Sequence, residues 1–179
     1  MRKALYLIGQ LSDNDVEWIV DHSQRRDVVA GTVLIREGHD IDTLIILLDG
    51  LLEVTGTTLG KQVVQLGAGE VVGEISLLDS RPPTATVTAV RKSVILAIPR
   101  EDLQMKLRSD VAFAARFYRA LAMFLAHRLR NMVQKLGYGK GQPLQEEVEY
   151  QDELSPEILD SVTLAGARFD RVLQKLLAH

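Results

Sequence analysis

The sequence predicts a mainly β domain with flanking helices, followed by a long helix. Between Val28 and Ile98 the chain is a series of short β-branched runs, most of them separated by glycine. After Pro99 the apolar residues recur at intervals of three and four, which is the period of a helix. With 179 residues, 46% of them hydrophobic, the chain is long enough for one buried core and an appendage.

A first helix is expected to begin at Ser12. Ser12 or Asp13 can accept the hydrogen bonds of its first turn, and Val16, Ile19 and Val20 fall on one face. The period changes after the charged run at 25–27, so the β region follows this helix directly.

Six strands are predicted in the β region. Many short strands at even spacing favour a sandwich or barrel over a parallel α/β sheet. Two of the runs are apolar on both faces, so we expect a ligand pocket or a partner to cover one side. The predicted strands are 32–35, 43–48, 51–54, 62–66, 84–90 and 94–98.

Two helices are expected next, a short one at 103–107 and a long one at about 110–136. Asp110 can cap the long helix. Its apolar stripe is wider than one domain needs, so we expect a homodimer through 110–136; a purely intramolecular helix is the alternative. The stripe contains Phe113, Phe117, Leu121, Phe124, Leu125, Leu129, Met132, Val133 and Leu136.

The last part of the chain is expected to be a linker and a final helix. Residues 137–154 combine glycines, a proline and acidic residues, which is typical of a linker. Ser155-Pro156 is a strong helix start, and 155–179 has an amphipathic pattern. Such a helix must dock on the barrel, on the long helix of a second copy, or on a partner protein.

The most specific motif runs from Gly73 to Leu78 and continues at 82–87. Together with other motifs in order along the chain, it makes residues ~10 to ~136 resemble a cyclic nucleotide-binding domain. This family includes bacterial catabolite activators, regulatory subunits of protein kinase A and cyclic nucleotide-gated channels. The resemblance implies a double-stranded β-helix, or jelly roll, within a domain at 1–136. The supporting motifs are Gly31 with Ile35, Glu37-Gly38, 46–50 with Val54, 66–74, and 96–99.

The resemblance also implies a binding site. Gly73 allows a ligand to approach the backbone, and Glu74 would hold the 2′-hydroxyl of a ribose. The backbone amides of Ile75 and Ser76 would contact a cyclic phosphate. Thr84 and Ala85 would line the same site, with cyclic AMP or cyclic GMP as the ligand.

One position departs from the family pattern. The arginine that pairs with the phosphate would stand directly before Thr84, where this chain has Pro83. A proline offers neither a charge nor an amide donor, whereas a guanidinium would form charge-assisted bonds. Arg81 lies two residues upstream and either turns into the site or is an exposed loop residue. The site therefore binds a cyclic nucleotide weakly or with altered specificity, or it has lost ligand binding.

The sequence offers no candidate residues for catalysis or metal binding. The chain has no cysteine, its four histidines are scattered, and no serine lies in a nucleophile motif. We therefore expect no enzyme activity, no metal and no cofactor.

Other partners are constrained by charge and hydropathy. The net charge is only −3, and residues 140–179 carry four basic against eight acidic residues, 4 − 8 = −4. Phosphates repel such a tail, and the 43 residues after Leu136 are too few for a winged helix, so we do not expect DNA binding. No apolar run reaches the ~20 residues of a membrane helix, which favours a cytoplasmic protein.

The sequence thus predicts a stand-alone bacterial regulatory module that binds a cyclic nucleotide and signals through its long helix. The alternative is a ligand-free domain that serves as a protein interaction scaffold, with the helix at 155–179 as the docking element. The arginines of the long helix would flank a dimer seam, pair with the acidic linker, or contact an acidic partner.

Overall fold

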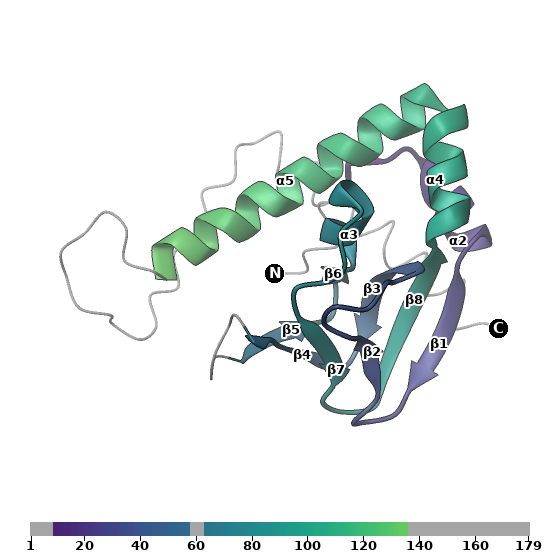
Figure 1. Ribbon diagram of the computed structural model, residues 1–179. Coiled ribbons are helices and arrows are strands. Elements are labelled where there is room, and N and C mark those ends of the chain that lie inside the picture. The colour runs from purple at the N-terminus through teal and green to yellow at the C-terminus, as the bar shows by residue number, and fades with distance from the viewer. Residues whose placement is uncertain (1–8, 58–62, 136–179) are drawn as a thin grey trace.

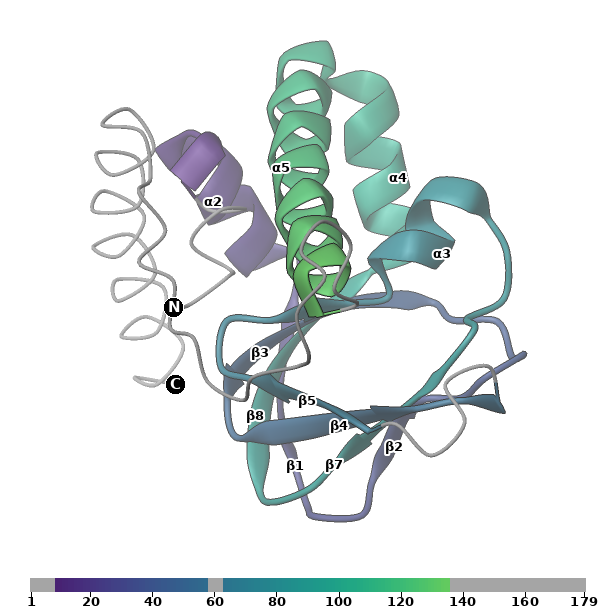
Figure 2. The same ribbon diagram turned by 90° about the vertical axis from the view of Figure 1, so that its left-hand side faces the viewer.

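Two four-stranded antiparallel sheets face each other in the computed structural model, and helices cover the outer side of one of them (Figures 1 and 2). The structure describes residues 9–57 and 63–135. One sheet has the order β1-β8-β3-β6 and the other the order β2-β7-β4-β5. The strands are β1 (Gln24–Val28), β2 (Val33–Ile35), β3 (Thr43–Asp49), β4 (Leu51–Thr55), β5 (Val64–Gly67), β6 (Val71–Val72), β7 (Thr86–Ala89) and β8 (Ser93–Pro99).

The helices flank this pair of sheets. They are α2 (Asp13–Asp21), α3 (Glu74–Asp79), α4 (Arg100–Ser109) and α5 (Val111–Lys135). Mainly antiparallel sheets with flanking helices form the jelly-roll architecture, so the predicted fold class is confirmed. None of the helices in the described ranges combines the length and hydropathy that a membrane-spanning segment requires.

The start of α2 follows from its sequence. The Ser12 hydroxyl accepts a hydrogen bond from the Asp15 amide, while the Asp15 carboxylate accepts one from the Ser12 amide. This capping box satisfies two amides that the first turn leaves without a helical acceptor.

Several boundaries differ from the sequence expectation. Strand β1 includes the charged run at 25–27, for which no strand was predicted. Four of its five residues are exposed, so the run shows no apolar alternation. Strand β6 has two residues, too few for a pattern. Helix α4 is longer than the predicted 103–107, and the short helix α3 at Glu74–Asp79 was not predicted.

The two central strands of the first sheet are buried on both faces. Ile45, Leu47 and Ile95 pack between the sheets. Leu44 and Ile98, on the opposite face, pack against the helices. The expectation that a pocket or a partner covers one face was wrong, because the chain's own α2, α4 and α5 do so.

Helix α5 packs on the barrel through its first half. Phe113, Phe117 and Phe124 are at most 1% exposed, whereas Leu129 is 57% exposed. The carboxylate of Asp110 accepts a hydrogen bond from the Phe113 amide at 2.9 Å, so Asp110 caps α5 as expected. The bounds of α5 lie close to the predicted 110–136. The predicted linker at 137–154 and the predicted helix at 155–179 lie outside the described residues.

Candidate ligand-binding site

The site is built on a glycine whose backbone only glycine adopts readily. Gly73 connects β6 to α3 with φ +91°. A Cβ at this position would lie 2.9 Å from Ile41 Cδ1 and 3.0 Å from the Thr43 carbonyl oxygen. Gly73 therefore fixes the start of α3 directly against the turn into β3.

The next residue places a buried carboxylate at the start of α3. Glu74 is 2% exposed, and its carboxylate accepts a hydrogen bond from the guanidinium of Arg128 on α5. The guanidinium carbon of Arg128 lies 5.9 Å from the centre of the Phe124 ring, so a second residue of α5 contacts this cation through its aromatic ring. Helix α5 thus reaches the predicted ribose-binding residue through one side chain.

The electrostatics of this pair are dominated by burial. Removal from water raises the pKa of Glu74. The charge of Arg128 opposes this rise, and the neighbouring carboxylate of Glu70 adds to it. Arg128 is therefore the main group that favours the ionised form of Glu74 in this structure.

The remaining residues of the first segment differ in exposure. Ser76 is 3% exposed and Ile75 is 51% exposed. Their amides belong to the first turn of α3, where the helix supplies no acceptors. These are the two amides that the family resemblance assigns to a cyclic phosphate.

Thr84 and Ala85 lie where the chain enters β7. Thr84 is exposed, whereas Ala85 is half-buried and packs on the same apolar cluster as Ile35 and Ile41. A Cβ added at Gly73 would also meet Ile41 and Ile35, so Gly73 and Ala85 border one apolar cluster.

Arg81 and Pro83 lie in the connection between α3 and β7. Ser80 ends α3 in the left-handed region with φ 57°, and the Arg81 amide donates to Asp79 Oδ1 at 3.0 Å. The Arg81 side chain is exposed and makes no hydrogen bond or ion pair within the described parts of the chain. Pro83 is half-buried, and its carbonyl oxygen accepts the Gly38 amide at 2.8 Å.

Arg128 is the site residue that sequence reasoning missed. It was expected to flank a dimer seam or to pair with the acidic linker, as was Arg116, which instead binds Asp15. A helical pattern contained the signal: Arg128 lies four residues after Phe124 and seven after Leu121, on the face that packs against the barrel. Within the described residues, no group of three or more His, Asp or Glu side chains forms a metal site.

Two facing antiparallel sheets, helices on one outer face and a short helix that begins at Glu74 define a β module with flanking helices. Residues 25–110 match the family model of the cyclic nucleotide-binding domain, and this part of the chain belongs to that family. The structure is similar to a cyclic nucleotide-binding domain from Methylobacillus flagellatus, with a TM-score of 0.68, 21% identity, and coverage of 79% of this chain and 85% of that one.

Curated relatives include two proteins whose names refer to cyclic AMP. The cyclic AMP receptor protein of Thermus thermophilus is 32% identical over 131 residues, which cover 72% of this chain and 59% of that protein. A cAMP-dependent protein kinase regulatory subunit of Blastocladiella emersonii is 26% identical over 149 residues, covering 76% and 37%. The chain thus spans less than two thirds of either relative.

Proposed function

We propose that this protein is a non-catalytic regulatory module that binds a cyclic nucleotide and signals occupancy through α5. The Glu74–Arg128 pair carries the proposal, because it connects the predicted ribose-binding residue to the helix that would transmit the signal. A ribose hydroxyl that hydrogen-bonds to Glu74 must compete with, or rearrange, the Arg128 guanidinium.

Arg128 can also take the place of the phosphate-binding arginine, for which this chain has Pro83. Pro83 supplies no charge to a cyclic phosphate, whereas the Arg128 side chain is 34% exposed beside the site. A guanidinium that moves from Glu74 to the phosphate would leave the carboxylate free for the ribose. Ligand binding would then be weak, because one ion pair is exchanged for another, and it would reposition part of α5.

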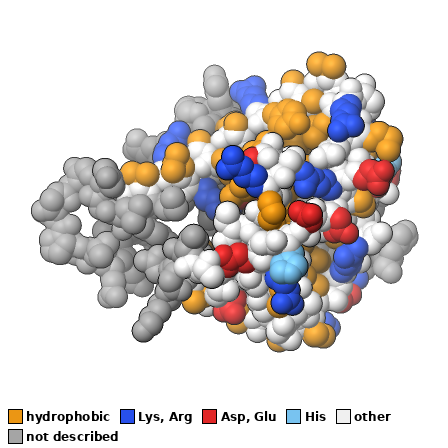
Figure 3. Space-filling view, in the orientation of Figure 1, with side chains coloured by type: hydrophobic (Ala, Val, Ile, Leu, Met, Phe, Trp, Pro, Cys, Tyr) orange, Lys and Arg blue, Asp and Glu red, His pale blue; other side chains and the backbone are white. Residues whose placement is uncertain are grey.

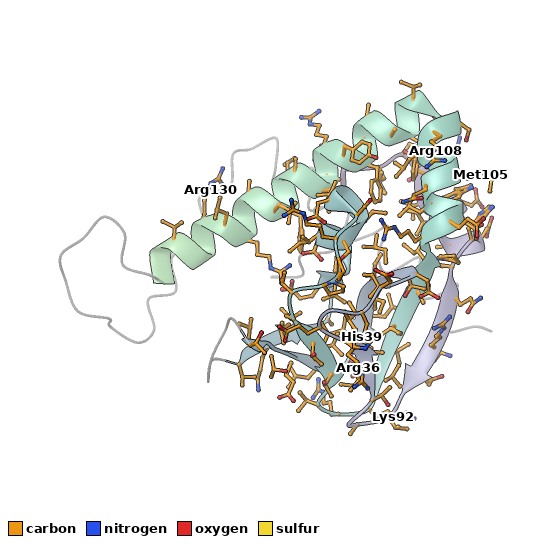
Figure 4. The ribbon with its side chains drawn as sticks, viewed as in Figure 1. Arg36, His39, Lys92, Met105, Arg108 and Arg130 are labelled. Carbon is orange, nitrogen blue, oxygen red and sulfur yellow. The ribbon has the colours of Figure 1, made fainter. Side chains whose placement is uncertain are left out.

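A homodimer through α5 is part of the same proposal. The side of α5 opposite the barrel is exposed and apolar along its whole length, and Figure 3 shows hydrophobic side chains at the surface along this helix. Two arginines, Arg119 and Arg130, flank it, and Figure 4 shows Arg130 pointing away from the barrel. The spacing suits a second copy of the same helix. The exposed stripe consists of Val111, Ala115, Tyr118, Ala122, Ala126, Leu129 and Val133.

The test is a calorimetric and thermal-shift titration with cyclic AMP and cyclic GMP. We expect Glu74→Ala and Arg128→Gln to weaken binding at least tenfold, and Arg130→Gln, an exposed cation on the same helix, to leave it unchanged. Pro83→Arg should strengthen binding ten- to a hundredfold, because a hydrogen bond to a charged group contributes about 1.5–3 kcal/mol. Equal affinity of the Arg128→Gln variant and the unchanged protein would refute the exchange.

The second candidate is a ligand-free interaction scaffold. Pro83 and the pairing of Glu74 with Arg128 favour it, since both leave the site without a free charged partner for a ligand. A protein that binds a ligand in its native state gains apparent stability, so no thermal shift at millimolar nucleotide would support the scaffold. In that case a protein partner would dock through residues 155–179.

A further inference from the structure

The turn after β2 is joined to the segment that leads into β7. The Glu37 amide donates to the Thr86 hydroxyl oxygen at 3.1 Å, and the Gly38 amide donates to the Pro83 carbonyl oxygen at 2.8 Å. These two hydrogen bonds bracket Thr84 and Ala85. The predicted phosphate-facing segment is thus held at both of its ends by adjacent residues of one turn.

The Glu37 side chain joins a third segment to this turn. Its carboxylate accepts hydrogen bonds from the Thr57 amide, at 3.1 Å to Oε2, and from the Thr57 hydroxyl. These bonds lower the pKa of Glu37, because they stabilise its charged form. Thr57 follows directly after β4 and the glycine at 56.

The glycine at 56 shows how closely this third segment approaches. A Cβ on Gly56 would lie 3.0 Å from the Thr84 carbonyl oxygen and 3.4 Å from Ala85 Cα. The Thr84–Ala85 segment therefore lies between the end of β4 on one side and the turn at Glu37 on the other.

We propose that Glu37 is a positioning residue for the Thr84–Ala85 segment. Its carboxylate ties the end of β4 to the turn after β2, and the backbone of that turn fixes the two ends of the segment. This sets the direction in which the groups of Thr84 and Ala85 face a ligand. With proline at position 83, the placement of these neutral groups matters more than it would beside an arginine. The proposal rests on the proposed function for its binding consequence only.

The first measurement needs no ligand. Amide chemical shifts of Thr84, Ala85 and Thr86 are compared by NMR between the unchanged protein and Glu37→Ala, Glu37→Gln, Thr57→Val and Arg36→Ala. Arg36 is the matched control, since it directly precedes Glu37, is exposed, and makes no side-chain hydrogen bond or ion pair within the described residues (Figure 4). We expect Glu37→Ala and Thr57→Val to shift the same three amides, Glu37→Gln to shift them less, and Arg36→Ala to leave them in place.

The second measurement is the affinity for cyclic AMP. Glu37→Ala should weaken binding about tenfold, while its melting temperature stays within about 2 °C of the unchanged protein. Adding Thr57→Val to Glu37→Ala should have no further effect, because both changes break one connection. Glu37→Gln should recover part of the affinity.

The outcomes separate this inference from the proposed function. Unmoved amides at 84–86 in Glu37→Ala would overturn the positioning role, whether or not nucleotide binds. Shifted amides in a protein that binds neither cyclic AMP nor cyclic GMP would leave the positioning role intact and refute the proposed function. Equal nucleotide affinities of Glu37→Ala and Arg36→Ala would overturn the binding consequence.

Discussion

The two halves of α5 are held in different ways. Residues 111–124 are fixed by three buried phenylalanines and by Arg116, which donates to both carboxylate oxygens of Asp15 at 2.6 and 2.9 Å. Residues 125–135 contact the barrel through Arg128 and the half-buried Leu125, while Leu129 and Val133 are exposed among the side chains that the structure describes. The first half belongs to the core and the second half belongs to the site.

Under the proposed function, this difference predicts that a ligand at Glu74 acts on the second half of α5. Among the described side chains, releasing the second half breaks the Glu74–Arg128 ion pair and the packing of Leu125, whereas releasing the first half exposes aromatic rings to water. A change at Glu74 should therefore move residues 125–135 and leave residues 111–124 in place.

The largest effect on stability is expected from a substitution in the first half of α5. Phe117→Ala should reduce the free energy of unfolding by about 3–5 kcal/mol, since it removes a fully buried ring and leaves a cavity. The measurement is urea unfolding followed by circular dichroism. Met105→Ala on α4, where the side chain is 60% exposed and outside the α5 stripe, is the control and should cost less than about 1 kcal/mol. Similar losses for both variants would contradict the assignment of this half to the core.

The second-largest effect on the free energy of unfolding is expected at the Asp15–Arg116 pair, and this effect should depend on pH. Burial acts to raise the pKa of Asp15, but hydrogen bonds from Arg116 and Ser12 outweigh it and lower the pKa. Because the pKa is lower in the folded state, the pair's contribution is present above the unfolded value of 3.8 and is lost as pH falls through the folded value.

Asp15→Asn should therefore reduce the free energy of unfolding by about 2–3 kcal/mol at pH 7. This estimate lies below the 3–5 kcal/mol typical of a fully buried pair, because the Arg116 side chain is 38% exposed. The variant should also lose less stability than the unchanged protein between pH 5 and pH 3. Parallel stability curves for the two proteins over this range would show that Asp15 is not responsible.

A substitution in the second half of α5 should change dimer formation rather than the stability of the folded monomer. Leu129→Glu should convert the proposed dimer to a monomer, measured by analytical ultracentrifugation, and change the monomer's free energy of unfolding by no more than about 0.5 kcal/mol. Met105→Glu is the control, because Met105 is 60% exposed on α4, away from the α5 stripe. A dimer that survives Leu129→Glu would remove the role of α5 in association.

Local features of the fold followed from the sequence more readily than contacts between distant segments. The Ser12 and Asp110 caps act over three residues, so the pattern alone located them. Gly73 and Glu74 were found through motif resemblance. Strand β1 was missed because its exposed, charged residues pair along an edge and give no alternation.

The contacts that define the site depend on folding. Arg128 and Glu74 are 54 residues apart, and Arg116 and Asp15 are 101 apart. Helical spacing could assign these arginines to the barrel-facing side or edge of α5. It could not name their partners, since those are set by where α2 and α3 are placed on the first sheet.

Gly73 also bears on how a site of this kind can diversify. Any side chain there would meet the Thr43 backbone and strain the left-handed turn, so the backbone at the start of α3 does not tolerate a substitution at Gly73. Positions 83 and 128 carry no such restriction, and one lies on a loop while the other lies on a helix. A lineage could therefore gain, weaken or redirect ligand preference by single exchanges at these two positions, without altering the backbone on which they act.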